Sequence, residues 1–172
     1  MKYEIKKRKD FQFFVVSDKY INYLKEYENK VCDNYGEKRT HIGIVIEINN
    51  IKYVAPLTSN DKDYLLFNKK LSRLVHPIEN GKLGFIRIAN MIPVPISELT
   101  PIFLRDVNDS KYKDILHSQY LFLKKEVNHT SIMKMAYKIY DIRCNFHNHY
   151  LHSDICNFKL LENLCNKWNS NY

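Results

Sequence analysis

Three side chains that suit phosphate are predicted to meet at the open end of one β-hairpin. They are the guanidinium of Arg39 and the hydroxyls of Thr58 and Ser59. A guanidinium matches two phosphate oxygens at once, while hydroxyls can hold further oxygens or orient a nucleophile. An unassisted serine hydroxyl is a weak base, so we expect Ser59 to position groups rather than to abstract a proton. In the alternative interpretation, Thr58 and Ser59 are an ordinary polar strand end.

The hairpin predicted to position these groups spans residues 41–59. Isoleucine alternates with other residues over 42–48, as a strand with one buried face requires. Asn49 and Asn50 form the predicted two-residue turn, because asparagine tolerates the positive φ of primed turns. Counted outward from this turn, the expected pairs are Ile48–Ile51, Glu47–Lys52, Ile46–Tyr53, His41–Thr58 and Thr40–Ser59. Arg39 then lies diagonal to Ser59, and His41 faces Thr58, where a histidine could act as a general base.

The remaining elements indicate an α+β fold in a single domain, residues 1–172. Short strands are expected at 11–16 and 83–89, and two prolines make 91–96 an edge strand at best. Ser17 is the predicted N-cap of a helix over 18–28, and residues 60–82 form a long irregular excursion. Three long helices are expected, from a cap at 109 or 110 to 127, from 130 to 150, and from a cap at 153 or 154 through 168. Because strands come early and helices late, the C-terminal half is mainly helical and packs on a twisted antiparallel sheet.

Charge and composition favour a folded protein that meets a polyanion. Of the 172 residues, 45% are hydrophobic and 13% aromatic, which argues against an intrinsically disordered chain. The formal net charge is +8, so nucleic acid is the first candidate partner, and a basic surface that only aids solubility is the alternative. No stretch could span a bilayer and no signal peptide is recognisable, so we expect no membrane partner and a cytoplasmic location with reduced thiols.

Several separated segments together resemble the ToxN/AbiQ family, the toxin components of type III toxin–antitoxin systems. The most specific of them is Ala55-Pro56-Leu57-Thr58-Ser59, which is similar to the hydroxyl-bearing end of the family's hairpin. The strand segments LGFI at 83–86 and NMIPVP at 90–95 are also similar. Weaker similarity lies in residues 17–24, 112–122 and 156–162. The segments follow the family's order and cover nearly the whole chain.

By this resemblance, the sheet is related to the barrel of the MazF/Kid toxins and is decorated with extra helices. The implied activity is metal-independent endoribonuclease cleavage of cellular or phage RNA, without a cofactor, with a role in abortive infection. Such cleavage would leave 2′,3′-cyclic phosphate and 5′-hydroxyl ends. The implied partner is a small antitoxin RNA, a repeat folded as a pseudoknot, which the toxin cuts from its precursor and which inhibits the toxin. This double use of one site predicts a closed hetero-oligomer in which each RNA touches two chains, the free protein being a monomer or small oligomer.

The family's active-site pattern maps onto four catalytic candidates, Tyr20, Arg39, Thr58 and Ser59. Tyr20 also lies on the aromatic stripe of its predicted helix, and the alternative is that this stripe is buried in the core. Arg39 stands where a lysine is common, and its guanidinium keeps the charge but cannot serve as a proton donor. Family members often have proline and a nearby lysine directly after the Thr-Ser pair, whereas this chain reads Asn60-Asp61-Lys62. The candidates for binding RNA are Lys19, Tyr35, Lys62, Lys69, Tyr112 and Gln119.

Other features of the chain allow different interpretations. Family members usually have an aromatic residue at the position of His41, so the resemblance implies a packing or bystander histidine rather than a general base. Residues 144–156 carry cysteines and histidines, but their spacing, C-x2-H-x-H-x2-H-x3-C, fits no closed zinc site well, so we expect no metal. The basic run at 6–9 is usually a solvated tail, although it could reach RNA phosphates. Two rival functions are a non-catalytic RNA-binding module and an assembly protein whose helices mediate oligomerisation. Cleavage of RNA in the presence of a chelator separates the enzyme from both.

Overall fold

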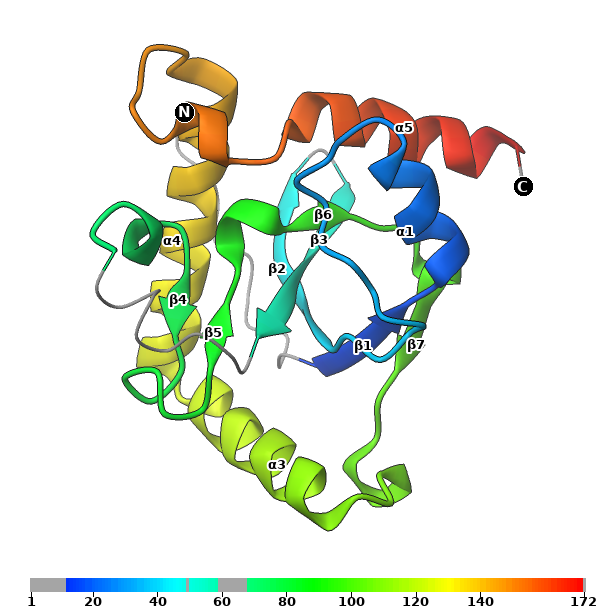
Figure 1. The fold of residues 1–172 in the computed structure, drawn as a ribbon, viewed down its shortest axis with the longest axis vertical. Coiled ribbons are helices and arrows are strands. Elements are labelled where there is room, and N and C mark those ends of the chain that lie inside the picture. Colours follow the sequence, from blue (N-terminus) through cyan, green and yellow to red (C-terminus); the bar gives the residue numbers. More distant parts are fainter. Residues whose placement is uncertain (1–11, 49, 59–67, 172) are drawn as a thin grey trace.

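An antiparallel sheet forms the centre of the computed structural model, which describes residues 12–48, 50–58 and 68–171 (Figure 1). Its strands are β1 (Gln12–Val16), β2 (His41–Ile48), β3 (Ile51–Thr58), β4 (His76–Pro77), β5 (Phe85–Ile86), β6 (Ile92–Pro93) and β7 (Leu99–Pro101). They follow the order β4-β5-β3-β2-β1-β7, and β6 pairs with β3 outside this path. Every pairing is antiparallel.

The sheet is open in the described part of the chain. Its path begins at β4 and ends at β7, and these two strands lie at opposite sides of the sheet in Figure 1. β4 pairs only with β5, and β7 pairs only with β1, among the described residues. The α+β class is confirmed, but the closed barrel that the resemblance implied is not seen here.

The helices follow the predicted order with shifted boundaries. They are α1 (Asp18–Lys25), α3 (Ser110–Lys124), α4 (Glu126–Asn145) and α5 (Phe158–Asn171). Two predicted caps are confirmed: the Ser17 hydroxyl accepts from the backbone N–H of Tyr20, and the Asp109 carboxylate accepts from that of Tyr112. α5 begins later than expected, where the Asn157 side chain accepts from the backbone N–H of Leu160 at 3.3 Å.

The helices cover the sheet and enclose its core. α4 contacts β2, α5 contacts β6, and α1 is joined to α5 by a hydrogen bond from the Tyr23 hydroxyl to the Leu164 carbonyl, 3.3 Å long. Large side chains fill the space between the helices and the sheet, and Tyr53 and Phe158 are fully buried there. Phe85 is buried in a separate small cluster with Val75. No helix among residues 12–48, 50–58 and 68–171 has the length and apolar character needed to cross a membrane.

The hairpin of β2 and β3 has the predicted turn but a different outer register. The pairs Ile48–Ile51, Glu47–Lys52 and Ile46–Tyr53 are confirmed, and Asn50 has the positive φ, +64°, that the turn requires. Between Gly43 and Ile46 the register then shifts by two residues, so that His41 pairs with Pro56. The predicted pairing of His41 with Thr58 is therefore wrong, because an irregularity in β2 takes up two residues without partners in β3.

Three short strands depart from the sequence-based expectation. β4 lies within residues 60–82, which were predicted to be irregular. Only Phe85–Ile86 of the predicted strand 83–89 is extended in the sheet, because residues 88–90 turn into a 3-10 helix. β7 has no counterpart among the predicted strands, since three residues are too few to show an alternating pattern. Its pairing with β1 extends the sheet on the side away from β3.

Candidate active site

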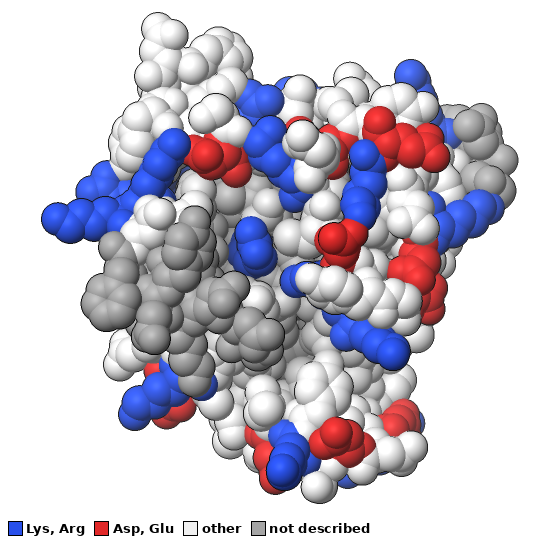
Figure 2. All heavy atoms as spheres, viewed as in Figure 1, with Lys and Arg blue, Asp and Glu red and all other residues white. Residues whose placement is uncertain are grey.

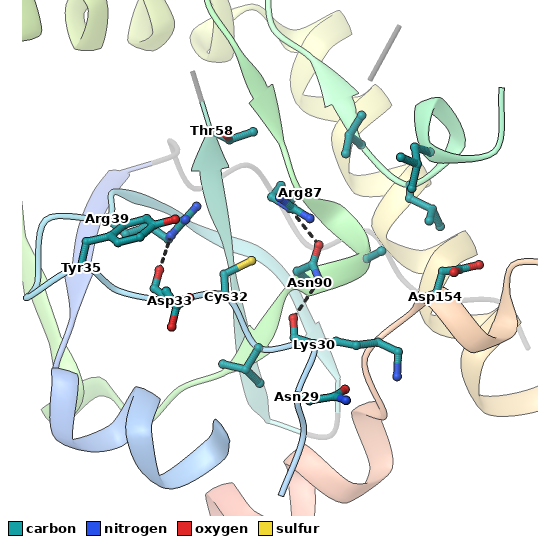
Figure 3. A pocket seen from close by; sticks show the side chains of 15 residues that line it. Asn29, Lys30, Cys32, Asp33, Tyr35, Arg39, Thr58, Arg87, Asn90 and Asp154 are labelled. Atoms are coloured by element: carbon teal, nitrogen blue, oxygen red, sulfur yellow. Dashed lines mark hydrogen bonds between the residues drawn. The ribbon is translucent and has the colours of Figure 1, made fainter. Parts of the chain in front are cut away.

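Four side chains gather where β3 ends and line two adjoining hollows: Tyr35, Arg39, Thr58 and Arg87. One hollow, of about 490 Å³, extends toward Lys30, Cys32 and Asp154 (Figure 3). The other, of about 450 Å³, extends toward Tyr112 and Gln119. On this face of the molecule, Lys and Arg side chains surround a central hollow (Figure 2). The shared residues therefore define the candidate site.

The register shift in β2 brings Arg39 to Thr58. The backbone N–H of Leu57 donates to the Thr40 carbonyl at 2.9 Å, so the pairing of the two strands continues past His41. One residue further, Nη1 of Arg39 donates to the Leu57 carbonyl at 3.0 Å. The two-residue shift thus places a guanidinium, rather than an imidazole, beside the end of β3.

The loop that precedes β2 fixes the orientation of this guanidinium. Nε of Arg39 donates to the backbone carbonyl of Asp33, and the Tyr35 ring lies 4.8 Å from the guanidinium carbon. Asn34 anchors the loop, because its amide donates to the Val16 carbonyl and to the Asp18 carboxylate, both at 2.7 Å. Tyr35 is 66% exposed and has a φ of +53°, so a tight turn presents its ring to solvent beside Arg39.

The tyrosine ring at the candidate site belongs to Tyr35 and not, as predicted, to Tyr20. Tyr20 is completely buried, and its hydroxyl donates to the Pro93 carbonyl at 2.7 Å. Its ring packs edge-on against Trp168, with 5.3 Å between ring centroids. Burial and the neighbouring Cys165 raise its pKa, which keeps the hydroxyl protonated. The prediction that Tyr20 is catalytic is therefore corrected: Tyr20 lies in the core. This agrees with the alternative that the aromatic stripe of its helix is buried.

His41 is a core residue, as expected. It is 1% exposed, its Nδ1 lies 3.1 Å from the Arg39 carbonyl, and burial lowers its pKa to about 3. A neutral, enclosed imidazole cannot act as a general base for a substrate in the hollow.

Tyr112 and Gln119, both predicted to bind RNA, line the second hollow from α3. The Tyr112 hydroxyl is hydrogen-bonded to the Thr40 hydroxyl, which joins the helix to the base of β2. Gln119 is 4% exposed and donates from Nε2 to the Leu83 carbonyl at 2.8 Å, while its Oε1 has no hydrogen-bond partner among the described residues. Tyr112 is thus available to a ligand, and Gln119 forms part of the wall.

The remaining predicted site residues lie elsewhere. Lys69 is exposed just before the 3-10 helix Leu71–Arg73 and is not among the lining residues. Lys19 lies on α1, with its ammonium 5.2 Å from the Trp168 ring centroid, and lines neither hollow. Ser59 and Lys62 fall outside the described residues. The structure therefore brings together Arg39, Thr58, Tyr35, Tyr112 and Gln119 of the ten candidates.

Sequence reasoning missed Arg87, which both hollows share, and Cys32, which lines the first hollow. Burial raises the pKa of the Cys32 thiol although the guanidinium groups of Arg87 and Arg39 act in the opposite direction, so the thiol stays protonated and is a poor nucleophile. Arg87 carries no local signal, because it lies within the apolar run 83–89 that reads as an ordinary strand.

The cysteine and histidine cluster at 144–156 is held by other contacts. Nδ1 of His147 lies 3.3 Å from Nε2 of His152, and Nη1 of Arg143 approaches the same imidazole. The described ranges contain no group of three or more His, Cys, Asp or Glu side chains arranged to hold a metal ion.

Comparison with known proteins places this arrangement in a family. Residues 12–166 match the family model of toxin ToxN of type III toxin–antitoxin systems. The chain is 32% identical to endoribonuclease ToxN of Bacillus thuringiensis subsp. kurstaki, over 91% of this chain and 84% of the relative. It is 34% identical to endoribonuclease AbiQ of Lactococcus lactis subsp. lactis, over 90% of this chain and 87% of the relative.

Solved structures agree with the sequence comparison. The structure of AbiQ, a lactococcal anti-phage endoribonuclease of a type III toxin–antitoxin system, superposes with a TM-score of 0.83 at 30% identity, covering 94% of this chain and 99% of AbiQ. A second structure, from a study of toxin inhibition by a non-coding RNA pseudoknot, has a TM-score of 0.78 at 30% identity and covers 94% of this chain and 99% of the other. The family match and the shared architecture lead to one conclusion: this chain belongs to the ToxN/AbiQ family of type III toxin–antitoxin toxins.

Proposed function

We propose that this chain is an endoribonuclease toxin that cleaves RNA without a metal ion and is held in check by a small antitoxin RNA. The observation that carries the proposal is the placement of Arg39 beside Thr58 at the open end of the hairpin, with an exposed Tyr35 ring stacked on the guanidinium. Two relatives with at least 32% identity are endoribonucleases, which supports RNA as the substrate. An anti-phage relative supports a role in abortive infection.

The proposed reaction uses the 2′-hydroxyl of the RNA as nucleophile. Its oxygen forms a bond to the adjacent phosphorus and loses its proton, while the bond from phosphorus to the 5′-oxygen breaks and that oxygen gains a proton. The products are a 2′,3′-cyclic phosphate and a 5′-hydroxyl. The protein supplies orientation and a positive environment for the charge that develops on the phosphorane, and neither requires a metal.

Each catalytic group has a role that its chemistry and position support. Arg39 stabilises the phosphorane, because a guanidinium donates to two phosphate oxygens together. Thr58 and Ser59 hold non-bridging oxygens or orient the 2′-hydroxyl. Tyr35 stacks on a base next to the scissile bond, since its ring is exposed and base–aromatic stacking contributes about 1–3 kcal/mol.

The two hollows suit the nucleotides on either side of the scissile phosphate. They meet at Arg39 and Thr58, and each, at about 490 and 450 Å³, has the size of a small-ligand pocket. Tyr112 lines the second hollow and can stack its ring on a base, which supports a role in substrate binding. Specificity for sequence would then reside in the walls of the hollows, away from the reacting atoms.

The proposal is tested with purified protein and an A-rich RNA incubated in EDTA. Cleavage is expected to persist, and mapped fragments should carry 2′,3′-cyclic phosphate and 5′-hydroxyl ends. Binding without cleavage would identify a non-catalytic RNA-binding module. Cleavage that appears only after addition of a divalent cation would contradict the metal-independent mechanism.

The antitoxin RNA is proposed to occupy the same basic groove and to extend beyond it. Tyr112 and Gln119 are its candidate contacts in the second hollow. Lys19 and Lys69, which lie outside both hollows, are further candidates, and Lys62 is a candidate outside the described residues. The small repeat RNA is expected to be a pseudoknot, which the structural relative inhibited by such an RNA supports.

Affinity for the antitoxin RNA is expected to fall steeply with salt, because phosphate contacts release counterions from the RNA. Replacement of Lys69 or Lys62 by alanine should reduce the slope of log Kd against log salt by about 1 for each phosphate that the variant no longer binds. Filter binding at 50–300 mM salt, a range of about sixfold, measures the slope. A Kd that stays constant across this range would contradict a phosphate-dominated interface.

The free protein is expected to be smaller than its complex with the RNA. If the toxin trims its own antitoxin, the cut end remains near Ser59 and Arg39 while the body of the RNA contacts a second chain, which closes a ring or a pair. Size-exclusion chromatography with light scattering measures both masses. A complex of one chain and one RNA at every concentration would exclude this bridging geometry but not the nuclease activity.

A further inference from the structure

Arg87 flanks the end of β3 on the side opposite Arg39. β3 lies between β2 and β5 in the sheet, Arg39 precedes β2, and Arg87 directly follows β5. The backbone N–H of Arg87 donates to the Pro56 carbonyl at 3.0 Å, two residues from Thr58. Figure 3 shows the two arginines on either side of Thr58. Each of the two strands beside β3 thus places one guanidinium next to the end of β3.

The Arg87 side chain is held so that its terminal nitrogens are left for a ligand. Nε donates to Oδ1 of Asn90 at 3.0 Å, and Nδ2 of Asn90 donates to the Lys30 carbonyl at 2.9 Å (Figure 3). The hydrogen bond at Nε orients the guanidinium without occupying Nη1 or Nη2. Within the described ranges no carboxylate forms an ion pair with Arg87. Its side chain is half-buried in the wall that both hollows share.

The two arginines differ in how much of each guanidinium remains available. Arg39 donates from Nε and from Nη1 to backbone carbonyls, so two of its five N–H groups are engaged. Among the described residues, the guanidinium of Arg87 donates only one hydrogen bond, from Nε to Asn90. Arg87 can therefore present both terminal amino groups to one phosphate, which is the fork geometry of bidentate anion binding.

We propose that Arg87 is a second catalytic arginine, which binds a non-bridging oxygen of the scissile phosphate opposite Arg39. The inference rests on the proposed nuclease function. Arg87 transfers no proton; it strengthens its hydrogen bonds to the phosphate as the 2′-oxygen bonds to phosphorus and negative charge builds on the non-bridging oxygens. Two guanidinium groups on opposite sides of one phosphate would take the place that a metal ion holds in other nucleases.

The test compares Arg87→Ala with Arg105→Ala, an exposed arginine of the 3-10 helix Leu104–Asp106 that lies outside both hollows. Both variants lose one positive charge. Arg87→Ala is expected to lower kcat for single-site RNA cleavage about a hundred- to a thousandfold, with a much smaller change in KM. Arg105→Ala should cleave like the parent protein. Arg87→Lys keeps the charge without the fork and should recover only part of the loss.

A substrate with sulfur in place of one non-bridging oxygen distinguishes contact with the phosphate from a structural role. One of the two phosphorothioate diastereomers should slow the parent protein and Arg105→Ala, because sulfur is a weaker hydrogen-bond acceptor. The same substitution should have no further effect on Arg87→Ala, in which no guanidinium reaches that oxygen. Added guanidinium ion should restore part of the activity of Arg87→Ala and none to the Arg39→Ala, Arg87→Ala double variant.

The outcomes separate this inference from the proposed function. If the parent protein does not cleave RNA, the nuclease assignment itself fails. If the parent cleaves while Arg87→Ala retains its kcat and its sensitivity to both diastereomers, the nuclease assignment stands and the role of Arg87 is overturned. A fall in kcat with an unchanged thio-effect would also overturn it, since the loss would then arise without contact to that oxygen.

Discussion

Replacement of Ser59 or Arg39 by alanine is expected to lower the rate of RNA cleavage about a hundred- to a thousandfold, which corresponds to about 2.7–4 kcal/mol of transition-state stabilisation. The Arg39 guanidinium donates hydrogen bonds to the backbone carbonyls of Leu57 and Asp33. Replacement of Arg39 by alanine therefore removes little of the core. Toxicity in growing cells should disappear with either substitution. Single-turnover cleavage with purified protein is the direct measurement.

Controls for this prediction address both folding and charge. Ser153→Ala removes a hydroxyl from an exposed position in the 3-10 helix His152–Asp154 and should cleave like the parent protein. Arg39→Lys restores the residue type common in the family and should retain much of the activity. Cleavage at the parental rate by a folded Ser59→Ala variant would contradict the assignment of Ser59.

If both groups act on the same phosphorane, their effects should not add. The double variant with Ser59→Ala and Arg39→Ala is then expected to cleave RNA only slightly more slowly than the less active of the two single variants. Additive losses would indicate that the two residues serve separate steps, such as binding and chemistry.

Replacement of Glu162 by alanine is expected to lower the free energy of unfolding by about 2–5 kcal/mol, because it leaves two buried hydroxyl donors without their acceptor, at about 1–3 kcal/mol each. Glu162 is 7% exposed, and its Oε1 accepts from the Tyr53 hydroxyl at 2.8 Å and from the Tyr140 hydroxyl at 2.6 Å. Its Oε2 pairs with Lys159 at 2.9 Å. Burial and the Glu162 carboxylate raise the pKa of both tyrosines, so both hydroxyls remain donors that need an acceptor.

This network joins three parts of the fold through one side chain. Glu162 lies on α5, Tyr140 on α4 and Tyr53 on β3, whose far end carries Thr58. Urea unfolding measured at neutral pH gives the free energy. Glu162→Gln keeps one acceptor oxygen for the two tyrosine hydroxyls and loses the ion pair with Lys159, so it should cost less than the alanine variant. A loss below about 1 kcal/mol for Glu162→Ala would show that solvent replaces the carboxylate.

Local sequence patterns were sufficient to predict the helices and the hairpin near the site. Ser17 and Asp109 cap their helices as predicted, because a cap depends on a side chain and a backbone group three residues apart. The turn at Asn50 and the inner hairpin pairs were likewise predictable from adjacent residues. The segment Ala55–Ser59 pointed to the family, and the family match over residues 12–166 agrees with it.

The two tyrosines considered for the candidate site show where local sequence patterns were insufficient. Tyr20 and Tyr35 both precede the hairpin, and each could supply a ring to its open end. The aromatic stripe of α1 carried Tyr20 into the core against Trp168, whereas a turn with φ of +53° placed Tyr35 over Arg39. Burial of a stripe is a property of the packed helix, so the choice between the two rings required the tertiary structure.

The sequence by itself determined the class of fold, the hairpin, the family and the identity of Arg39 and Thr58 as candidates, because these depend on neighbouring residues and on a motif. Only the tertiary structure decided which groups face each other. The two-residue irregularity in β2 exchanged His41 for Arg39 opposite Thr58, and the pairing of β5 with β3 brought Arg87 to the same place from 29 residues away along the chain. Strand register and neighbour order are set by the burial of whole faces against α4 and α5, and that energy is shared by residues far apart in the sequence.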